Sequence, residues 1–295
     1  MAQERAGTAG TALFETHRRL LMSMAYQLLG STADAEDVVQ ETWLRWDRAD
    51  QAGIDNPRAW LVRVATRIAL DRLRKASTRR ERYVGPWLPE PLLTSPDVAE
   101  DAELAESVSM AMLVVLETLS PLERAVFVLR EAFGFSHGEI AEAIGRAEPA
   151  VRQLAHRARE HVQARRPRFP ADRAVRREVT ERFLATSLGG DLDDLLRVLA
   201  PDVTLWADGG GLATAPRQPI HGRDKVARFL VGAAGRGLPD LAFQVRQVNG
   251  GPAAVLTSAG VPVAVVVLDV DPGGDRVQTI YLVANPDKLT TLGGS

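Results

Sequence analysis

The chain has 295 residues, of which 45% are apolar, and its net charge is −2, values ordinary for a soluble protein of about two domains. The absence of cysteine excludes disulfides, zinc fingers and thiol catalysis. There is no long uncharged apolar run and no apolar leader after Met1, so we expect no membrane span and no secretory signal, and we expect a cytoplasmic protein.

The small net charge hides two basic segments. Residues 58–82 hold nine Arg or Lys against two acids, and residues 146–168 hold seven against two. Residues 31–50 instead hold six acids and two bases, and residues 87–107 hold six acids and no base. Two basic segments joined by an acidic tether indicate two separate contacts with a polyanion, although solvated helix faces are an alternative for either segment alone.

Helical patterns fill most of the first 170 residues. An apolar-periodic stretch at 13–29 ends at Gly30, and Ser31 with Asp34 forms a capping-box pattern that opens a helix to about Trp46. Further helices are predicted at 58–80, 100–119, 121–133, 136–144 and 148–163. The prolines of residues 85–96 predict a stiff, extended linker, and RRPRFPA at 165–171 predicts a second boundary.

The composition changes beyond residue 171. Helices are predicted at 173–188, 192–199 and 224–234, and strands at 202–208, 241–248, 253–258, 262–270 and 276–283. Asn249-Gly250-Gly251 is a strong turn signal between two of these strands. Helices followed by turn-linked strands predict an α+β domain with an antiparallel sheet.

The helix at 58–80 has two distinct faces. Its apolar stripe comprises Leu61, Val64, Ala65, Ile68 and Ala69. Arg63, Arg67 and Arg74 fall within about 40° of one another on the other side, with Trp60 beside them. Cations next to an aromatic ring suit melting DNA, because they offer charge to phosphates and a flat face to an unstacked base. Packing of Trp60 against a neighbouring helix is the alternative.

The second basic segment has the pattern of a helix-turn-helix. Ser136 and Glu139 form a capping box, Gly145 permits a tight turn, and Pro149 suits the first turn of the next helix. The outward residues of that helix are Arg152, Gln153, His156, Arg157 and Arg159. Arg and Gln near the start of a recognition helix suit contacts to guanine and adenine edges in the major groove. A helical hairpin within a bundle is the alternative.

These segments together resemble the extracytoplasmic-function sigma factors, which are DNA-binding initiation subunits of RNA polymerase. DAEDVVQETWLRW (34–46) resembles the region 2 helix that grips the polymerase clamp, and WLVRVATRIALDRLRK (60–75) resembles the adjoining segment that opens and reads the −10 element. LSPLERAVFVLREAFGFSHGEIAEAIGRAEPAVRQLAHRARE (119–160) resembles region 4, which reads the −35 element. Three segments in this order and at this spacing make the resemblance specific.

The resemblance implies roles for particular residues. The polymerase contact falls on Asp34, Asp37, Gln40 and Glu41, and an acidic helix that repels DNA suits a protein partner. The −10 contact falls on Trp60, Arg63, Arg67, Asp71, Arg74 and Lys75. The −35 contact falls on the outward residues of the helix at 148–163. Many members carry asparagine where Arg67 stands, so a base-specific amide contact does not carry over to that position.

The C-terminal part resembles the SnoaL-like, nuclear transport factor 2-like fold, a curved sheet around a cone-shaped pocket. A subgroup of these sigma factors has such a domain, which is understood to tune sigma activity in cis. Three motifs match that subgroup: WLPEP with Trp87, Leu88 and Pro89; DGGG with Asp208, Gly209, Gly210 and Gly211; and NPDKL with Asn285, Pro286 and Asp287. Leu212 replaces the lysine that often follows the glycines.

The expected organisation is region 2 at 10–84, a proline-rich linker at 85–102, region 4 at 103–166 and the SnoaL-like domain at 172–290. The fold class is multidomain: two all-α modules followed by an α+β domain. The expected partners are core RNA polymerase and promoter DNA, with a small ligand in the C-terminal pocket left open. We expect no cofactor, no metal and no catalytic residue.

Two alternatives remain at this point. A helix-turn-helix regulator with an effector domain explains the second basic segment but gives no purpose to the acidic helix at 34–46. An enzyme activity of the SnoaL-like domain would need pocket residues such as Asp208, His221 and Tyr281. No spacing links those three residues, so catalysis rests on fold analogy alone.

Overall fold

The computed structural model describes residues 2–80, 82–94, 109–165, 173–189, 192–235, 238–271 and 273–292. The chain forms two compact units: residues 1–81 with 115–165, and residues 82–114 with 166–295. The linker predicted at 85–102 therefore belongs to the same unit as the C-terminal domain. The early part of the helix predicted at 100–119, and residues 166–171 of the second boundary, lie outside the described residues.

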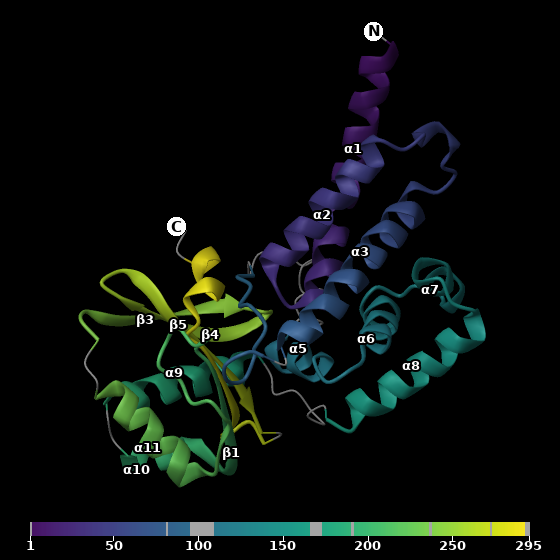
Figure 1. Cartoon of the computed structure of the whole chain (residues 1–295). Helices are drawn as coiled ribbons and strands as arrows, with labels where there is room; N and C mark the ends of the chain where they lie inside the picture. Colours follow the sequence, from purple (N-terminus) through teal and green to yellow (C-terminus); the bar gives the residue numbers. More distant parts are fainter. Residues whose placement is uncertain are drawn as a thin grey trace. The chain divides into compact units, whose positions relative to one another are not determined.

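Three long helices open the first unit: α1 (Ala2–Leu29), α2 (Thr32–Asp47) and α3 (Pro57–Arg80) (Figure 1). Gly30 ends α1 with a φ of +69°, a left-handed value that glycine adopts without strain. Ser31 Oγ then accepts a hydrogen bond from the backbone N–H of Asp34 at 3.2 Å, which is one half of the predicted capping box. A short 3₁₀ turn, η1 (Gln51–Gly53), lies between α2 and α3.

The remaining helices of the first unit follow the predicted helix-turn-helix closely. After α5 (Met110–Leu116), which spans the division between the units, come α6 (Pro121–Phe127), a π-helical turn η2 (Val128–Ala132), α7 (His137–Ile144) and α8 (Glu148–Gln163). Ser136 and Glu139 form the predicted capping box on α7. Gly145 ends α7 in the left-handed region with a φ of +66°, and Pro149 lies in the first turn of α8.

A buried ionic network joins the two helical regions of the first unit. The guanidinium of Arg124, 1% exposed, donates two hydrogen bonds to the Gln27 carbonyl, at 3.1 and 2.9 Å. The carboxylate of Glu117 accepts from both Arg124 and Arg80. Arg80 also donates to the Leu29 carbonyl at 2.8 Å. Burial lowers the pKa of Arg124, so the nearby carboxylate and carbonyl oxygens are needed to keep the charged form inside.

The second unit is built on one six-stranded sheet with the order β2-β1-β6-β5-β4-β3. The strands are β1 (Leu199–Asp208), β2 (Ile220–His221), β3 (Leu241–Val248), β4 (Gly251–Ser258), β5 (Val261–Val270) and β6 (Val277–Val283). The prediction of an antiparallel sheet was wrong at one position, because β1 and β6 pair in parallel. No local turn joins these two strands, so packing of distant segments sets their direction. The short strand β2 was not predicted.

Both faces of the sheet are covered. Helices α9 (Arg173–Gly189), α10 (Leu192–Val198) and α11 (Arg223–Ala234) lie on one face, as Figure 1 shows. Leu88 of the linker, Met110 at the start of α5, and Leu289 and Leu292 near the C-terminus pack on the other face. Because both faces are buried, the central strand β5 is apolar along most of its length rather than alternating.

Among the described helices, none combines the length and the apolar character needed to cross a bilayer.

Candidate functional site

The acidic face of α2 is partly neutralised by one arginine of α3. Arg72 Nη1 lies 2.8 Å from Asp37 Oδ2 and 3.6 Å from Asp34 Oδ1, and its Nη2 lies 3.8 Å from Glu41 Oε2. Asp37 and Gln40 are exposed, whereas Asp34 and Glu41 are half-buried. Arg72 therefore fixes the carboxylates in position while part of their negative charge stays available.

Leu44 lies one helical turn beyond Gln40 on α2, and its side chain is 45% exposed. A large apolar residue amid exposed carboxylates suits a protein partner better than DNA. Leu44 was not predicted as a binding residue. The structure identifies it, because Leu44 falls outside the buried residues of α2, which are Thr32, Ala35, Val38, Val39, Thr42 and Trp46.

The predicted −10 residues of α3 lie on its accessible side. Arg67, Asp71, Arg74 and Lys75 are exposed and Arg63 is half-buried. Asp71 Oδ1 accepts from Arg74 Nη1 at 3.0 Å, so this acid orients a neighbouring base. The Trp60 ring is half-buried and stacks at a tilt against Trp46, with centroids 5.5 Å apart. The Trp60 ring therefore packs against a neighbouring helix while part of its surface stays exposed.

Arg67 contacts α7, the first helix of the helix-turn-helix. Its Nε donates to the Ala143 carbonyl at 3.1 Å and its Nη2 to the Glu142 carbonyl at 3.2 Å. Both carbonyls belong to the last turn of α7, where unpaired carbonyls and the helix dipole favour a cation. In this arrangement one predicted −10 residue is engaged within the protein.

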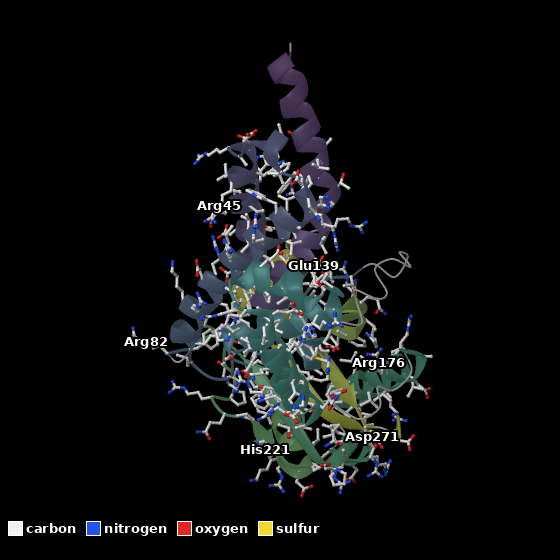
Figure 2. All side chains as sticks on the ribbon, turned by 90° about the vertical axis from the view of Figure 1, so that its right-hand side faces the viewer. Arg45, Arg82, Glu139, Arg176, His221 and Asp271 are labelled. Atoms are coloured by element: carbon white, nitrogen blue, oxygen red, sulfur yellow. The ribbon has the colours of Figure 1, made fainter. Side chains whose placement is uncertain are left out.

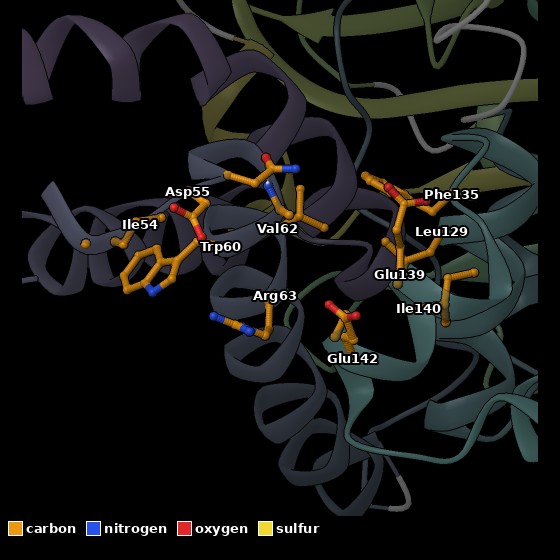
Figure 3. Close-up of a pocket in the computed structure, with 14 residues that line it drawn as sticks. Ile54, Asp55, Trp60, Val62, Arg63, Leu129, Phe135, Glu139, Ile140 and Glu142 are labelled. Carbon is orange, nitrogen blue, oxygen red and sulfur yellow. Dashed lines mark hydrogen bonds between the residues drawn. The ribbon is translucent and has the colours of Figure 1, made fainter. Parts of the chain in front are cut away.

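A hollow of about 460 Å³ lies beside this contact (Figure 3). Trp60 and Arg63 of α3 line it, together with the loop at 53–56 and with Glu139 and Glu142 of α7. Carboxylates of α7 therefore line the same hollow as basic and aromatic side chains of α3. A polyanion approaching Arg63 from this side would meet negative charge unless α7 moved away.

The predicted −35 residues all lie exposed on α8, while Val151, Ala155, Ala158 and Val162 are buried. Four of the five pair with carboxylates in the same unit: Arg152 with Glu148 at 2.5 Å, Arg157 with Glu123 at 3.3 Å, Arg159 with Glu131 at 2.7 Å and His156 with Glu160 at 3.5 Å. Exposed pairs of this kind contribute about 0–1 kcal/mol each, so DNA can replace them. Gln153 is exposed between them.

A buried cluster of hydrogen bonds in the second unit surrounds Asp208 at the end of β1. The Asp208 carboxylate is 0% exposed and accepts from Tyr83 Oη at 2.6 Å, Leu88 N at 2.9 Å, Gly210 N at 3.0 Å and Lys288 Nζ at 2.7 Å. The donors come from Tyr83 just before the linker, from Leu88 of the linker, from the glycine loop and from the C-terminal turn. We call this cluster the Asp208 site. It brings together residues of all three predicted regulatory motifs.

The glycines of this loop are required by close backbone and side-chain packing. A Cβ on Gly209 would lie 2.5 Å from the Ala213 carbonyl oxygen. Gly210 has a φ of +61°, and a Cβ there would lie within 2.5 Å of the Asn285 amide group. Gly211 also has a positive φ, and Val84, which directly precedes the predicted linker, lies 3.3 Å from where its Cβ would be. The linker and the C-terminal turn therefore approach this loop more closely than larger residues allow.

The C-terminal motif closes the Asp208 site. Asn285 Nδ2 donates to Tyr83 Oη at 2.8 Å, and Asn285 Oδ1 accepts from Asp287 N at 3.1 Å, which caps the turn η3 (Pro286–Lys288). Burial, and secondly the hydrogen bond to Asp208, raises the pKa of Tyr83, so its hydroxyl stays protonated as a donor.

Lys288 was missed by the sequence analysis. Its Nζ donates to the Leu88 carbonyl at 2.5 Å and lies 4.1 Å from the centroid of the Trp87 ring. A lysine within the NPDKL motif was a weak signal, because the motif itself does not reveal a partner 80 residues away.

The linker has a second attachment to the same domain. Leu92 N donates to Asn249 Oδ1 at 3.2 Å and the Leu92 carbonyl accepts from Asn249 N at 2.8 Å. Thr94 N donates to the Gln247 carbonyl at 3.0 Å, and Leu93 forms a β-bridge with Val248. Leu88, Pro89 and Pro91 are buried along this path. Residues 83–94 thus form part of the C-terminal domain's surface.

The three candidates for catalysis do not converge on one cavity. The Asp208 carboxylate already accepts four hydrogen bonds within the Asp208 site. His221 lies exposed on β2, 3.2 Å from Thr204 Oγ1 (Figure 2). Tyr281 is buried on β6 on the face that holds Leu88, and burial raises its pKa.

Comparison with known proteins agrees with this architecture. The family models for sigma-70 region 2, sigma-70 region 4 and a SnoaL-like domain match residues 13–79, 109–162 and 180–283. The ECF RNA polymerase sigma factor SigJ of Mycobacterium tuberculosis is 42% identical over 290 residues, covering 94% of this chain and 92% of that protein. The probable ECF RNA polymerase sigma factor SigI of the same organism is 34% identical over 285 residues, covering 96% and 95%.

The fold leads to the same family. A crystal structure of the M. tuberculosis extracytoplasmic function sigma factor SigJ matches with a TM-score of 0.75 at 38% identity, covering 95% of this chain and 98% of that one. The relatives are sigma factors by name, and the match extends through the SnoaL-like domain. The chain belongs to the extracytoplasmic-function sigma factors, the RNA polymerase subunits that direct promoter-specific transcription initiation.

Proposed function

We propose that the C-terminal domain regulates this sigma factor in cis by holding the linker in the Asp208 site. In the same proposal, the exposed face of α2 binds core polymerase, α3 reads the −10 element and α8 reads the −35 element. A cytoplasmic location accompanies this function, because core polymerase and promoter DNA are there. The observation that carries the regulatory role is the buried Asp208 carboxylate, which accepts from Tyr83, Leu88 and Lys288 at once.

Promoter binding requires the two DNA-reading regions to separate. The −10 and −35 elements lie roughly 80 Å apart along B-form DNA at about 3.4 Å per base pair. Arg67 on α3 instead contacts the last turn of α7, and carboxylates of α7 line the hollow beside Arg63. This closed arrangement is incompatible with simultaneous binding of both elements, so α3 and α7 must part before a promoter is engaged.

The linker sets how far the regions can part. Residues 83–94 are the described part of the connection between α3 and region 4, and an extended segment of that length contributes a reach on the order of 40 Å. While Asp208 and Asn249 bind this segment to the C-terminal domain, the segment cannot extend to let the two DNA-reading regions separate. Release of the linker favours the open form, and a stronger hold favours the closed one.

The test is run-off transcription with purified core polymerase and the Asp208→Asn variant. The substitution preserves size but removes the charge that pairs with Lys288, and one of its amide N–H groups must face a former donor. We expect transcription to rise severalfold. Asp202→Asn is the matched control, because Asp202 lies exposed on the same strand.

Lys288→Met is a second variant, and it tests the same hold without disturbing the loop. It removes the ammonium group from Asp208 and Leu88 but keeps a long apolar stem over Trp87. If both variants retain the native fold by circular dichroism and transcribe as the wild type does, the Asp208 site has no regulatory role.

A further inference from the structure

The hollow between α3 and α7 combines a buried apolar lining with exposed charged groups. It lies within the first unit and encloses about 460 Å³. That volume is within the range of roughly 300–1,000 Å³ that is common for small-molecule sites. The buried apolar residues that line it are Val62 of α3 and, from region 4, Leu129, Phe135 and Ile140. They offer a water-excluding surface to the compact apolar body of a ligand.

Two carboxylates at this hollow have no ion-pair partner among the described residues. They are Asp55, in the loop before α3, and Glu142, in the last turn of α7, and both are exposed. Figure 3 shows them on different walls, one from region 2 and one from region 4. Arg67 lies close to Glu142, but it donates to the backbone carbonyls of Glu142 and Ala143 rather than to the carboxylate. These two charges are therefore available to a ligand.

The other charged groups of the hollow leave this excess of negative charge in place. Glu139 Oε2 accepts from the N–H and the hydroxyl of Ser136, each at 2.7 Å. These hydrogen bonds, followed by the charge of Arg58, lower the pKa of Glu139, so it stays ionised. Arg63 is the basic residue of the described lining, and Figure 3 shows its side chain directed away from Glu142. Three carboxylates thus face one guanidinium, a balance that attracts a cation.

The Trp60 ring adds an aromatic surface to the hollow. The ring packs against Trp46 but is only half-buried, so part of it is exposed where it lines the hollow. Indole attracts cations more strongly than the other aromatic side chains do. Phe135, which also lines the hollow, already shows this chemistry, because the guanidinium carbon of Arg58 lies 4.9 Å from its ring centroid. An aromatic ring beside unpaired carboxylates suits an organic cation better than a neutral molecule or an anion.

We propose that this hollow binds one small organic cation with an apolar or aromatic body, and that the occupant holds region 2 and region 4 together. The positive group pairs with Asp55 and Glu142, and the body lies against Trp60 and the buried apolar lining. The binding half does not depend on the proposed function. The second half rests on the proposal that α3 and α7 part before a promoter is engaged.

The link to transcription follows from where the lining residues come from. Residues 53–63 belong to region 2 and residues 129–143 to region 4, so the hollow is complete only while the two regions are in contact. A ligand that contacts both walls binds the closed arrangement in preference to the open one and shifts the population towards it. The same ligand covers Trp60 and Arg63, two predicted −10 residues. Occupancy should therefore lower transcription.

The binding test is calorimetric titration of the full chain with three ligands that share one ring system. They are the cation 2-naphthylmethylamine, the neutral 2-naphthalenemethanol and the anion 2-naphthoate. We expect the amine to saturate a single site, the alcohol to bind about tenfold more weakly, and the anion not to bind. The double variant Asp55→Asn with Glu142→Gln preserves the shapes of both side chains, and it should weaken the amine about tenfold while leaving the alcohol unchanged. Glu178→Gln, at an exposed position of α9 in the second unit, is the matched control.

Contrary results are equally distinct. If the alcohol binds as tightly as the amine, or if naphthoate competes with the amine, the ligand class is wrong. If the double variant binds the amine as the wild type does, the site is elsewhere. An amine that fails to bind the wild type at millimolar concentration overturns the proposal altogether.

Coupling to transcription is measured as the ratio of run-off transcript with saturating amine to transcript without it. We expect this ratio to fall severalfold for the wild type and for Glu178→Gln, and to stay near one for the double variant at the same amine concentration. A ratio near one for the wild type, despite binding, would overturn the coupling and leave the site in place. A failure of cis-regulation is seen separately, as transcription that ignores Asp208→Asn while the amine still binds.

Discussion

The charges of this protein fall into two groups that differ in burial. On α8 the ion pairs are exposed: the side chain of Arg152 is 64% exposed and that of Arg157 is 61% exposed. Arg124 and Asp208 are instead 1% and 0% exposed, and each is surrounded by several hydrogen-bonding partners. Both groups consist of acids and bases in contact, yet water screens only the first.

This difference distinguishes surfaces that can bind a partner from buried charges that hold distant segments of the chain together. An exposed pair contributes about 0–1 kcal/mol, so its arginine can leave for a phosphate or a base at little cost. A buried charge that loses its partner costs about 3–5 kcal/mol, so it holds distant segments in one arrangement. The α8 pairs are suited to exchange with DNA, whereas Arg124 and Asp208 are suited to hold the chain against itself.

The largest expected effect comes from breaking the buried network of the first unit. Glu117→Gln keeps the shape of the side chain but leaves Arg124 buried without a carboxylate. We expect the free energy of unfolding to fall by about 3–5 kcal/mol, measured by urea denaturation. Glu160→Gln on α8, where the side chain is 64% exposed, should change it by less than about 0.5 kcal/mol. Equal losses in the two variants would contradict the distinction.

The next largest effect is expected in promoter selectivity. Arg152→Ala should cost about 1–3 kcal/mol on the preferred −35 sequence and relax the preference at one position, because a base contact is lost. Gln153→Ala should relax a neighbouring position. Holoenzyme binding to a set of −35 variants measures this. Selectivity that survives both substitutions would show that α8 is not the reading helix.

Polymerase affinity should respond more moderately. Charge reversal at Asp37 would place a lysine against Arg72, so the neutral isosteres Asp37→Asn and Glu41→Gln give the cleaner test. Together they should weaken binding to core polymerase by about 1–2 kcal/mol, roughly tenfold, with stability little changed. Leu44→Ser should weaken it further if the exposed leucine is buried by the partner. Unaltered affinity in the triple variant would remove α2 from the interface.

The smallest effect is expected at Arg159, which pairs with Glu131 and lies late on α8. A phosphate contact there gives no sequence information. Arg159→Ala should weaken all promoters alike and reduce the slope of log K against log salt by about one. A change in sequence preference would instead make Arg159 a base-reading residue.

Local sequence patterns predicted the elements of the helix-turn-helix with little error. The capping box at Ser136, the glycine at 145 and the proline at 149 act within one or two turns of helix. The local sequence is therefore enough to predict where these helices start and stop. The same holds for β3–β6, whose turns are marked by Asn249-Gly250 and by a glycine at 274 with a φ of +76°. The three regulatory motifs were named from a resemblance rather than from a pattern, and their meeting in the Asp208 site is a finding of the structure.

Other features depended on segments far apart in the chain. The parallel pairing of β1 with β6, the contact of Arg67 with α7 and the partners of Lys288 all join residues more than 70 positions apart. Arg124 carries no mark in the sequence that separates it from a surface arginine. Burial depends on what packs around a residue. The periodicity of apolar residues therefore does not predict the burial of a charged side chain whose hydrogen-bonding partners lie far away in the sequence.

The sequence by itself determined where most of the helices and strands lie, which helix faces are basic, acidic or apolar, and which family the chain resembles, because those properties depend mainly on neighbouring residues. The tertiary structure alone decided that Asp208 is a buried acceptor for the linker and that Arg67 contacts α7. These depend on which surfaces exclude water together, and that is settled only when the distant segments pack.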